Sequence, residues 1–338
     1  MHCGGMTDAF IPFLTLAVVQ TVSGCFYKLA QPYLFRPTSL IVLAEVGKCA
    51  WIVCERGSKG VNIFIRVFEV SPQIALQGAA LAFLYTLNHH LLFASFGSFG
   101  PAVVSLFRSG SIVITGVLRW AAFTQELDRI QWYGFVLTPV GLLIAQAGCV
   151  PLSDFVSVRR GPEYAILLGS ILVTSVTSVW NSHLVRTNGP EITASLNFLL
   201  YVFGSGFAGL LFCLRESPAS FFVGHSPITA CIVVANIVTG VAVNAVYRST
   251  GVLVKVLSGA AATCALLALE IAFSWNQQSS VALVLGCFVV FLAVLIFMDC
   301  PLEEKLHVNL LSRRTFGFFV ICAMLFYVTS VYEPQLRH

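Results

Sequence analysis

Long apolar stretches recur along the chain and are separated by short polar segments. Each stretch has about 18 to 25 residues, which is enough for a helix to cross a hydrocarbon core of ~30 Å. The pattern predicts ten membrane spans, near residues 9–28, 38–54, 74–96, 101–123, 131–149, 164–185, 193–214, 227–247, 251–273 and 280–298.

An eleventh apolar run, 315–332, follows the basic pair Arg313 and Arg314. It fits either an additional span or a helix lying in the membrane interface. We favour an additional span, which would place the C-terminus in the lumen.

Composition supports a polytopic, all-helical membrane protein. Of 338 residues, 57% are hydrophobic and 10% are charged, and the mean hydropathy is +0.87. A soluble domain would carry about a quarter charged residues. Few residues remain outside the predicted spans to form a water-soluble domain, so we expect the functional site to lie between the helices.

Basic residues favour the loops that follow even-numbered spans, which predicts a cytosolic N-terminus. The even loops hold Arg56, Lys59, Arg66, Arg129, Arg186 and Arg248, with Lys305, Arg313 and Arg314 after the tenth span, and the odd loops hold Lys28, Arg36, Arg159, Arg160 and Arg215. The N-terminus has no basic region typical of a cleavable signal peptide, so the first span is expected to stay as a signal-anchor.

Two segments five spans apart begin alike. FRSGSIVITGVL (107–118) opens the fourth span, and YRSTGVLVKVLS (247–258) leads into the ninth. Because an odd number of spans reverses direction across the membrane, this pattern predicts two inverted five-helix repeats around a midplane site. Chance similarity between apolar segments is the alternative.

The repeat divides the chain into four predicted units. These are a first half at 9–149, a linker at 150–163, a second half at 164–298 and an extension at 299–338.

Arg248 and Lys255 interrupt an otherwise apolar run. They are seven residues apart, about two helical turns or ~10.5 Å, so we expect them on one helix face. A charge inside the bilayer costs a few kcal/mol or more, and a phosphate would compensate it. Arg108 opens the fourth span in the same way. The alternatives are a loop cation for Arg248, a structural acid partner for Lys255 and a snorkelling side chain for Arg108.

Five motifs occur in a specific order and spacing: LAVVQTVSGCFYK (16–28), VLAEVGK (42–48), LYTLNHHL (84–91), RIQWYGFVLTPVGLLIAQ (129–146) and SLNFLLYVFG (195–204). With them, the chain resembles the nucleotide-sugar transporters of the drug/metabolite transporter superfamily. The branch resembled carries UDP-galactose, UDP-N-acetylglucosamine and CMP-sialic acid. The resemblance covers the ten predicted core spans and implies the ten-helix fold.

The chain also departs from the family's patterns. K-Y-x-D-N-x-x-K keeps its end cations as Arg248 and Lys255, but its middle becomes Ser249, Thr250, Gly251 and Val252. Y-Q-x-K, at 108–111, loses its lysine and gains an arginine three positions earlier. The basic phosphate contacts are therefore retained or re-sited, whereas groups that would frame the nucleoside and sugar have changed.

The resemblance and the residue types together predict a substrate site without catalytic residues or metal ligands. The cations hold phosphate, the tyrosines stack on base or ribose, the amides and the histidine form hydrogen bonds, and the serines donate to phosphate or ribose. The alternative for these side chains is structural pairing or helix packing. The predicted site residues are Arg248, Lys255, Arg108, Lys48, Glu45, Tyr85, Asn88, His89, Ser111, Asn197, Tyr201 and Ser249.

The resemblance implies exchange of a cytosolic nucleotide sugar, with a UDP-sugar favoured, for a lumenal nucleoside monophosphate by alternating access in the Golgi membrane or, alternatively, the ER membrane. Two alternatives stay open: a carrier of another organic anion, and a non-transporting partner of a transporter or glycosyltransferase. We expect contact with membrane lipid and a homodimer or a glycosyltransferase partner. No enzyme activity, cofactor or nucleic-acid partner is expected, because no motif for one occurs in the sequence.

Overall fold

The computed structural model describes residues 4–30, 37–123, 129–147, 161–272 and 281–297, and the secondary structure of these residues consists of helices joined by short turns and loops, with no β-strand among them. The predicted all-helical class is therefore confirmed for the described part of the chain. Most of the predicted linker and all of the predicted extension, including the eleventh span, lie outside the described residues. The helices are α1 (Gly4–Ala30), α2 (Pro37–Ser58), α3 (Ile63–Val67), α4 (Pro72–Phe123), α5 (Arg129–Ala147), α6 (Gly161–Thr187), α7 (Pro190–Arg215), a 3₁₀ turn (Pro218–Ser220), α8 (Pro227–Ser249), α9 (Val252–Ala272) and α10 (Val281–Phe297).

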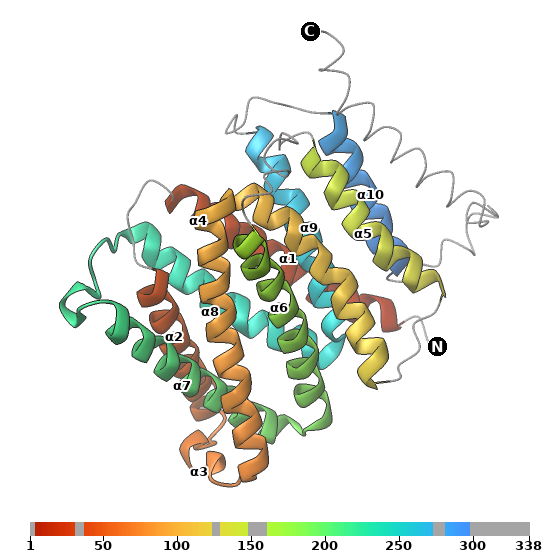
Figure 1. The fold of residues 1–338 in the computed structure, drawn as a ribbon. Coiled ribbons are helices and arrows are strands. Elements are labelled where there is room, and N and C mark those ends of the chain that lie inside the picture. Colours follow the sequence, from red (N-terminus) through yellow and green to blue (C-terminus); the bar gives the residue numbers. More distant parts are fainter. Residues whose placement is uncertain (1–3, 31–36, 124–128, 148–160, 273–280, 298–338) are drawn as a thin grey trace.

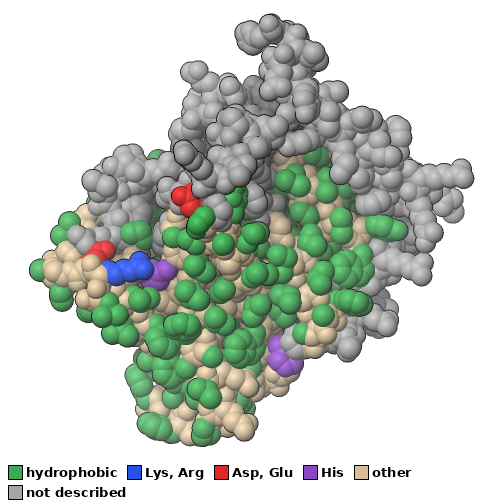
Figure 2. Space-filling model, in the orientation of Figure 1, with side chains coloured by type: hydrophobic (Ala, Val, Ile, Leu, Met, Phe, Trp, Pro, Cys, Tyr) green, Lys and Arg blue, Asp and Glu red, His purple; other side chains and the backbone are tan. Residues whose placement is uncertain are grey.

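Within the described ranges, five helices are long and apolar enough to cross a membrane. They cover Phe10–Tyr27, Pro37–Ser58, Pro162–Thr187, Pro190–Arg215 and Pro227–Ser249. Shorter apolar helical segments cover Gly110–Ala122, Trp132–Ala145, Val252–Leu266 and Val284–Phe297. Figure 2 shows hydrophobic side chains over most of the described surface on one face, with Lys and Arg confined to a small area. This exterior suits lipid and supports a multi-pass membrane protein.

Helix α4 covers two of the predicted spans. The predicted spans 74–96 and 101–123 imply a break between them, and this is wrong, because α4 is helical from Pro72 to Phe123. Figure 1 shows that α4 bends sharply, so that its two arms run in different directions. The segment SFGSFG explains the bend, since Gly/Ser positions allow a helix to kink. Helical hydrogen bonding through the bend avoids leaving backbone groups unpaired in an apolar environment.

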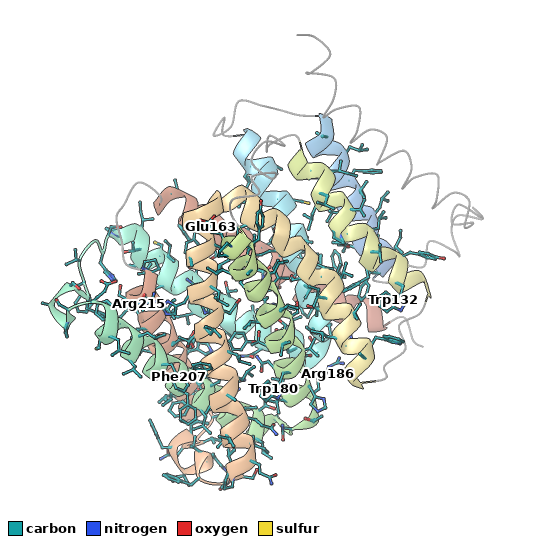
Figure 3. The ribbon with its side chains drawn as sticks, viewed as in Figure 1. Trp132, Glu163, Trp180, Arg186, Phe207 and Arg215 are labelled. Atoms are coloured by element: carbon teal, nitrogen blue, oxygen red, sulfur yellow. The ribbon has the colours of Figure 1, made fainter. Side chains whose placement is uncertain are left out.

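The ends of several helices meet on one face of the molecule. Arg56, at the end of α2, donates to Glu191 Oε1 at 2.8 Å and to the carbonyl of Pro190 at 3.0 Å, both at the start of α7. Arg186, at the end of α6, donates from Nε to the carbonyl of Tyr247 near the end of α8 at 3.3 Å. Figure 3 shows Arg186 and Glu163 at opposite ends of α6. The face with Arg186 therefore carries loops predicted to be cytosolic.

Small residues let α5 and α10 pack closely along each other (Figure 1). A Cβ atom at Gly134 would lie 2.6 Å from the carbonyl oxygen of Ala293. A Cβ at Gly141 would lie 2.8 Å from both the backbone nitrogen and Cγ2 of Val290. Contacts of this kind are typical of small-residue interfaces between membrane helices.

We expect Gly141→Ala to destabilise the protein by about 1–3 kcal/mol, because the added methyl group meets backbone that cannot move alone. The change is measured as a lower Tm of the detergent-purified protein. The matched control is Gly206→Ala on α7, where an added Cβ meets nothing within 4 Å. Alanine favours helix there, so the control should keep or raise Tm. Equal losses in both variants would contradict close packing of α5 and α10.

The remaining helices surround an interior space. Helix α1 packs on α8 and α9, α2 packs on α7 and α8, and α4 packs on α6 and α7. Side chains from α2, α4, α6, α7, α8 and α9 can therefore approach one another from both halves of the sequence.

Candidate functional site

Helix α6 lines the interior with hydroxyl and amide groups. Ser175 and Thr177 are 0% exposed, Ser178 is 1% exposed and Asn181 is 4% exposed. The hydroxyls of Ser175 and Thr177 donate to carbonyls four residues earlier in the helix, a common way for hydroxyls to be satisfied in apolar surroundings. These residues were not among the predicted site residues. Their recurrence every three to four positions in the predicted span 164–185 is the sequence signal that would have identified them.

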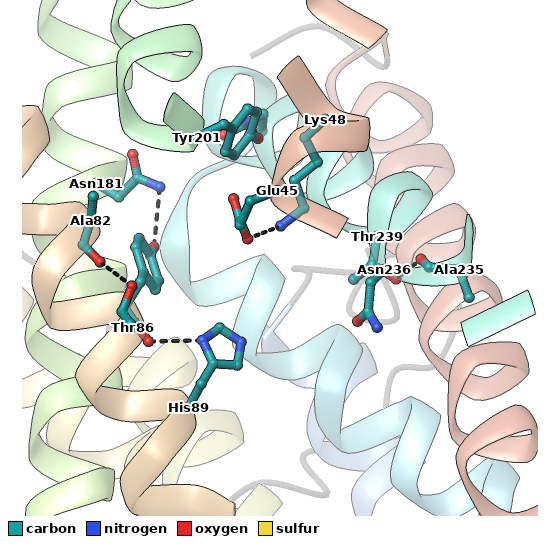
Figure 4. Close-up of polar contacts among 12 residues, drawn as sticks. Glu45, Lys48, Ala82, Thr86, His89, Asn181, Tyr201, Ala235, Asn236 and Thr239 are labelled. Atoms are coloured by element: carbon teal, nitrogen blue, oxygen red, sulfur yellow. Dashed lines mark hydrogen bonds and ion pairs between the residues drawn. The ribbon is translucent and has the colours of Figure 1, made fainter. Parts of the chain in front are cut away.

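An ion pair lies on α2, facing this interior. Lys48 Nζ is 2.6 Å from Glu45 Oε1 and 5.2 Å from the centre of the Tyr201 ring on α7, within cation–π range (Figure 4). Two glycines make room for the pair. A Cβ at Gly204 would lie 3.5 Å from Glu45 Oε2, and one at Gly240 would lie 2.8 Å from Lys48 Cε. Four of these residues come from α2 and α7, and Gly240 comes from α8, so the pair is held between three helices.

Helix α4 adds Tyr85, Asn88 and His89. Asn181 donates to the Tyr85 hydroxyl at 3.1 Å, and Thr174 donates to Asn88 Oδ1 at 2.9 Å, so α6 fixes both side chains. His89 Nδ1 lies 2.8 Å from the carbonyl of Tyr85, which can only accept, so Nδ1 carries a proton. In the neutral imidazole, Nε2 is then free to accept a hydrogen bond.

Helix α7 adds Asn197 and Tyr201, one helical turn apart. Asn244 of α8 donates to the Tyr201 hydroxyl at 2.6 Å. Asn197 is 7% exposed, and its Oδ1 has no hydrogen-bond partner among the described residues. A buried acceptor without a partner costs about 1–3 kcal/mol, so a ligand or water that donates to it would stabilise the site.

Two cations, one on α9 and one on α4, lie within electrostatic range of each other beside the polar side chains of α6. Lys255 of α9 is half-buried, and its Nζ donates to Ser178 Oγ at 3.1 Å. Arg108 of α4 is solvent-accessible and lies within electrostatic range of both Lys255 and His89. Within the described part of the chain, neither cation forms an ion pair. Since like charges repel, most strongly where water is scarce, an anion between them would be stabilising.

Arg248 lies elsewhere, which corrects the expectation that it shares a helix face with Lys255. Helix α8 ends at Ser249 and α9 begins at Val252, because Gly251 adopts φ +100° and breaks the helix. Lys255 lies within electrostatic range of Arg108 instead. Arg248 is exposed and lines a surface pocket of about 490 Å³ at the helix ends.

The two predicted serines form different contacts. Ser249 is exposed, and its hydroxyl donates to the carbonyl of Ala245 at 2.9 Å. The carbonyl of Ser111 accepts from Ser175 Oγ at 3.3 Å and joins α4 to α6. Ser111 lies on α4 beside the interior, and Arg248 and Ser249 lie at the surface. The other nine predicted residues lie on the helices around the interior: Glu45, Lys48, Tyr85, Asn88, His89, Arg108, Asn197, Tyr201 and Lys255.

A small cavity of about 40 Å³ adjoins the ion pair. Glu45, Lys48 and His89 line it together with Tyr27 and Asn236, whose side chains are hydrogen-bonded at 2.8 Å. Pockets that bind small-molecule ligands usually have about 300–1,000 Å³. This cavity is therefore too small for a nucleotide-sized ligand, which would need the helices that line it to move apart.

Comparisons with known proteins agree with the family that the motifs indicated. The chain is 28% identical over 260 residues to a protein named CMP-sialic acid transporter 4 of Arabidopsis thaliana, covering 76% of this chain and 70% of that protein. It is 27% identical over 217 residues to CMP-sialic acid transporter 2 of Oryza sativa subsp. indica, covering 63% of this chain and 60% of that protein. These homologues are nucleotide-sugar transporter family members. No protein-family model matches the chain.

The fold also occurs in a crystal structure. It aligns with a TM-score of 0.69 at 17% sequence identity, covering 89% of this chain and 99% of the other chain. At this identity the likeness concerns the fold alone.

Proposed function

We propose that this homologue of the nucleotide-sugar transporters exchanges a cytosolic nucleotide sugar for a lumenal nucleoside monophosphate by alternating access. Its relatives, 26–28% identical and named as CMP-sialic acid transporters, support nucleotide-sugar transport. The proposal rests on Lys255 and Arg108, two cations within electrostatic range of each other for which the described residues supply no acidic partner.

The charges of the interior match those of a phosphate-bearing cargo. Glu45 and Lys48 neutralise each other, so Lys255 and Arg108 leave an excess of two positive charges. A phosphate monoester carries about −1.5 to −2 at neutral pH. Arginine binds phosphate oxygens in a bidentate manner, and lysine acts as a compact point charge, so the two are complementary phosphate ligands.

The uncharged groups around the cations would hold the rest of the cargo. Tyr85 and Tyr201 offer ring faces for a base or ribose, and the hydrogen bonds from Asn181 and Asn244 orient them. His89 and Asn197 offer acceptor atoms for donors on the base or sugar. The pair Glu45–Lys48 would place a further cation beside Tyr201.

Helix pairing supports the predicted inverted repeat. If the two arms of α4 count as the third and fourth spans, the inverted repeat relates each helix of the first half to the helix five spans later. The contacts of α2 with α7 and of α5 with α10 are then contacts between equivalent helices of the two halves. The packing of α1 on α8 maps onto that of α6 on α4, which also occurs. Transport would follow if the halves at 9–149 and 164–298 rock about the polar cluster and open its small cavity to each side in turn.

The base of the cargo is proposed to be a pyrimidine. The sequence motifs favoured a UDP-sugar, whereas the names of the relatives favour CMP-sialic acid as the cargo. Both carry about two negative charges, so the interior cations suit either cargo. The proposed location is the Golgi membrane, where such cargo would be used.

Counter-exchange tests the proposal. Proteoliposomes holding the purified chain are loaded with CMP, UMP or GMP and offered labelled CMP-sialic acid, UDP-galactose or GDP-mannose. We expect uptake into CMP- or UMP-loaded vesicles at least about tenfold above unloaded ones, with little exchange of GDP-mannose. Absence of exchange with every nucleotide would overturn the proposal and favour a carrier of another anion or a non-transporting partner.

A further inference from the structure

A second basic site lies at the helix ends, away from the interior cluster. Its pocket, of about 490 Å³, is lined by Val185, Arg186, Asn188, Pro190 and Arg248, and we refer to it as the arginine pocket. These residues belong to the end of α6, the turn into α7 and the end of α8. Figure 3 places Arg186 at the end of α6 opposite Glu163, on the face predicted to be cytosolic.

Positive charge accumulates at this pocket. Arg248 is exposed and forms no ion pair in the described part of the chain. Arg186 uses Nε for the carbonyl of Tyr247 and lies within electrostatic range of Arg119. The acidic residue in the first turn of α7, Glu191, is held by Arg56 at 2.8 Å. The positive end of the α7 dipole adds to the field, because Gly189 provides no side-chain cap.

Gly251 sets the environment of the Arg186 guanidinium. A Cβ at this position would lie 3.2 Å from Cζ and 3.3 Å from both terminal nitrogens of Arg186. In the pattern K-Y-x-D-N-x-x-K, to which residues 248–255 are similar, this position holds an acid. Here a glycine with φ +100° leaves the guanidinium without that carboxylate.

We propose that the arginine pocket is a second anion site, which takes a phosphate group through Arg186 and Arg248 independently of the interior site. Its volume is in the usual range for small-molecule sites, and two arginines beside a helix N-terminus suit phosphate oxygens. The phosphate can belong to a soluble nucleotide or diphosphate, or to the headgroup of an anionic lipid at the membrane edge.

Binding to Lys255→Met protein tests this site separately from transport, since that variant disables the interior site under the proposed function. In phosphatidylcholine nanodiscs, calorimetric titration with pyrophosphate reports the soluble source. In nanodiscs that also contain phosphatidylinositol 4-phosphate, native mass spectrometry of the extracted protein reports the lipid source. We expect saturable binding in one arm, weakened about tenfold or more by Arg248→Gln, because a charge-assisted contact is lost.

Gly251→Asp and Gly251→Asn provide the matched pair. Both side chains meet the same backbone strain and space, but only aspartate places a carboxylate against Arg186. We expect Gly251→Asp to weaken phosphate binding at least about fivefold more than Gly251→Asn. The site is refuted if neither phosphate source binds, or if binding is insensitive to both Arg248→Gln and Gly251→Asp.

Discussion

Replacing Lys255 with methionine is expected to lower nucleotide-sugar exchange by about 100-fold while leaving Tm unchanged or higher. Among the described residues, the lysine ammonium has only the hydroxyl of Ser178 as a hydrogen-bond partner, and the charge of Arg108 repels it. A charge-assisted contact to phosphate contributes about 1.5–3 kcal/mol, equivalent to roughly 10- to 150-fold in affinity. Removing an uncompensated charge from the interior should not cost stability.

Lys255→Arg is the control for this variant, because it retains the charge and should keep a measurable part of the exchange. Initial rates in proteoliposomes and Tm from intrinsic fluorescence are recorded on the same preparations. A structural role for Lys255 predicts the opposite combination, namely a lower Tm in Lys255→Met with exchange reduced only in proportion to folded protein.

Replacing Glu45 with glutamine is expected to destabilise the protein by about 2–4 kcal/mol and to abolish exchange. The two side chains of the Glu45–Lys48 pair are 13% and 14% exposed, and they are enclosed between α2, α7 and α8. Loss of the carboxylate leaves Lys48 charged, poorly hydrated and without its partner. Breaking one side of a buried pair usually costs more than replacing both sides.

The double variant Glu45→Gln/Lys48→Met separates stability from function. It removes both charges, so Tm should recover most of the loss seen in Glu45→Gln, whereas exchange should stay low because the cation beside Tyr201 is gone. Equal Tm values for the single and double variants would show that the pair is not energetically coupled.

Much of the fold followed from the hydrophobic pattern. The helical class and the approximate positions of the spans follow from the length of each apolar stretch. In lipid, the backbone of such a stretch must form its hydrogen bonds internally, and a helix allows this. The break predicted between spans 74–96 and 101–123 was wrong because the glycines and serines there allow either a break or a bend in a helix, and the sequence does not distinguish them. The break at Gly251 is the reverse case, where a positive φ separates two cations that seven-residue spacing had placed on one face.

The candidate site was predicted unevenly. Charged and aromatic residues such as Lys48, Tyr85 and Lys255 are conspicuous in apolar spans, and the structure brings them to the interior. The polar face of α6 was missed because each serine or threonine is unremarkable in a membrane helix. Asn181 and Ser178 contribute to the site because they form hydrogen bonds with Tyr85 on α4 and Lys255 on α9. These contacts depend on the packing of helices that are distant in sequence, so the sequence alone does not reveal them.

Ligand-induced stabilisation of the purified protein shows whether its interior cations bind phosphate, when CMP and UMP are compared with cytidine and uridine. Each pair differs only in the phosphate that Lys255 and Arg108 are proposed to hold. A ligand present at 100 times its Kd stabilises by about 2.7 kcal/mol. We predict that a monophosphate raises Tm of the wild-type chain, that its nucleoside does not, and that the difference disappears in Lys255→Met. Equal stabilisation by nucleoside and nucleotide, or an undiminished effect of the nucleotide on Lys255→Met, would contradict phosphate binding by the interior cations.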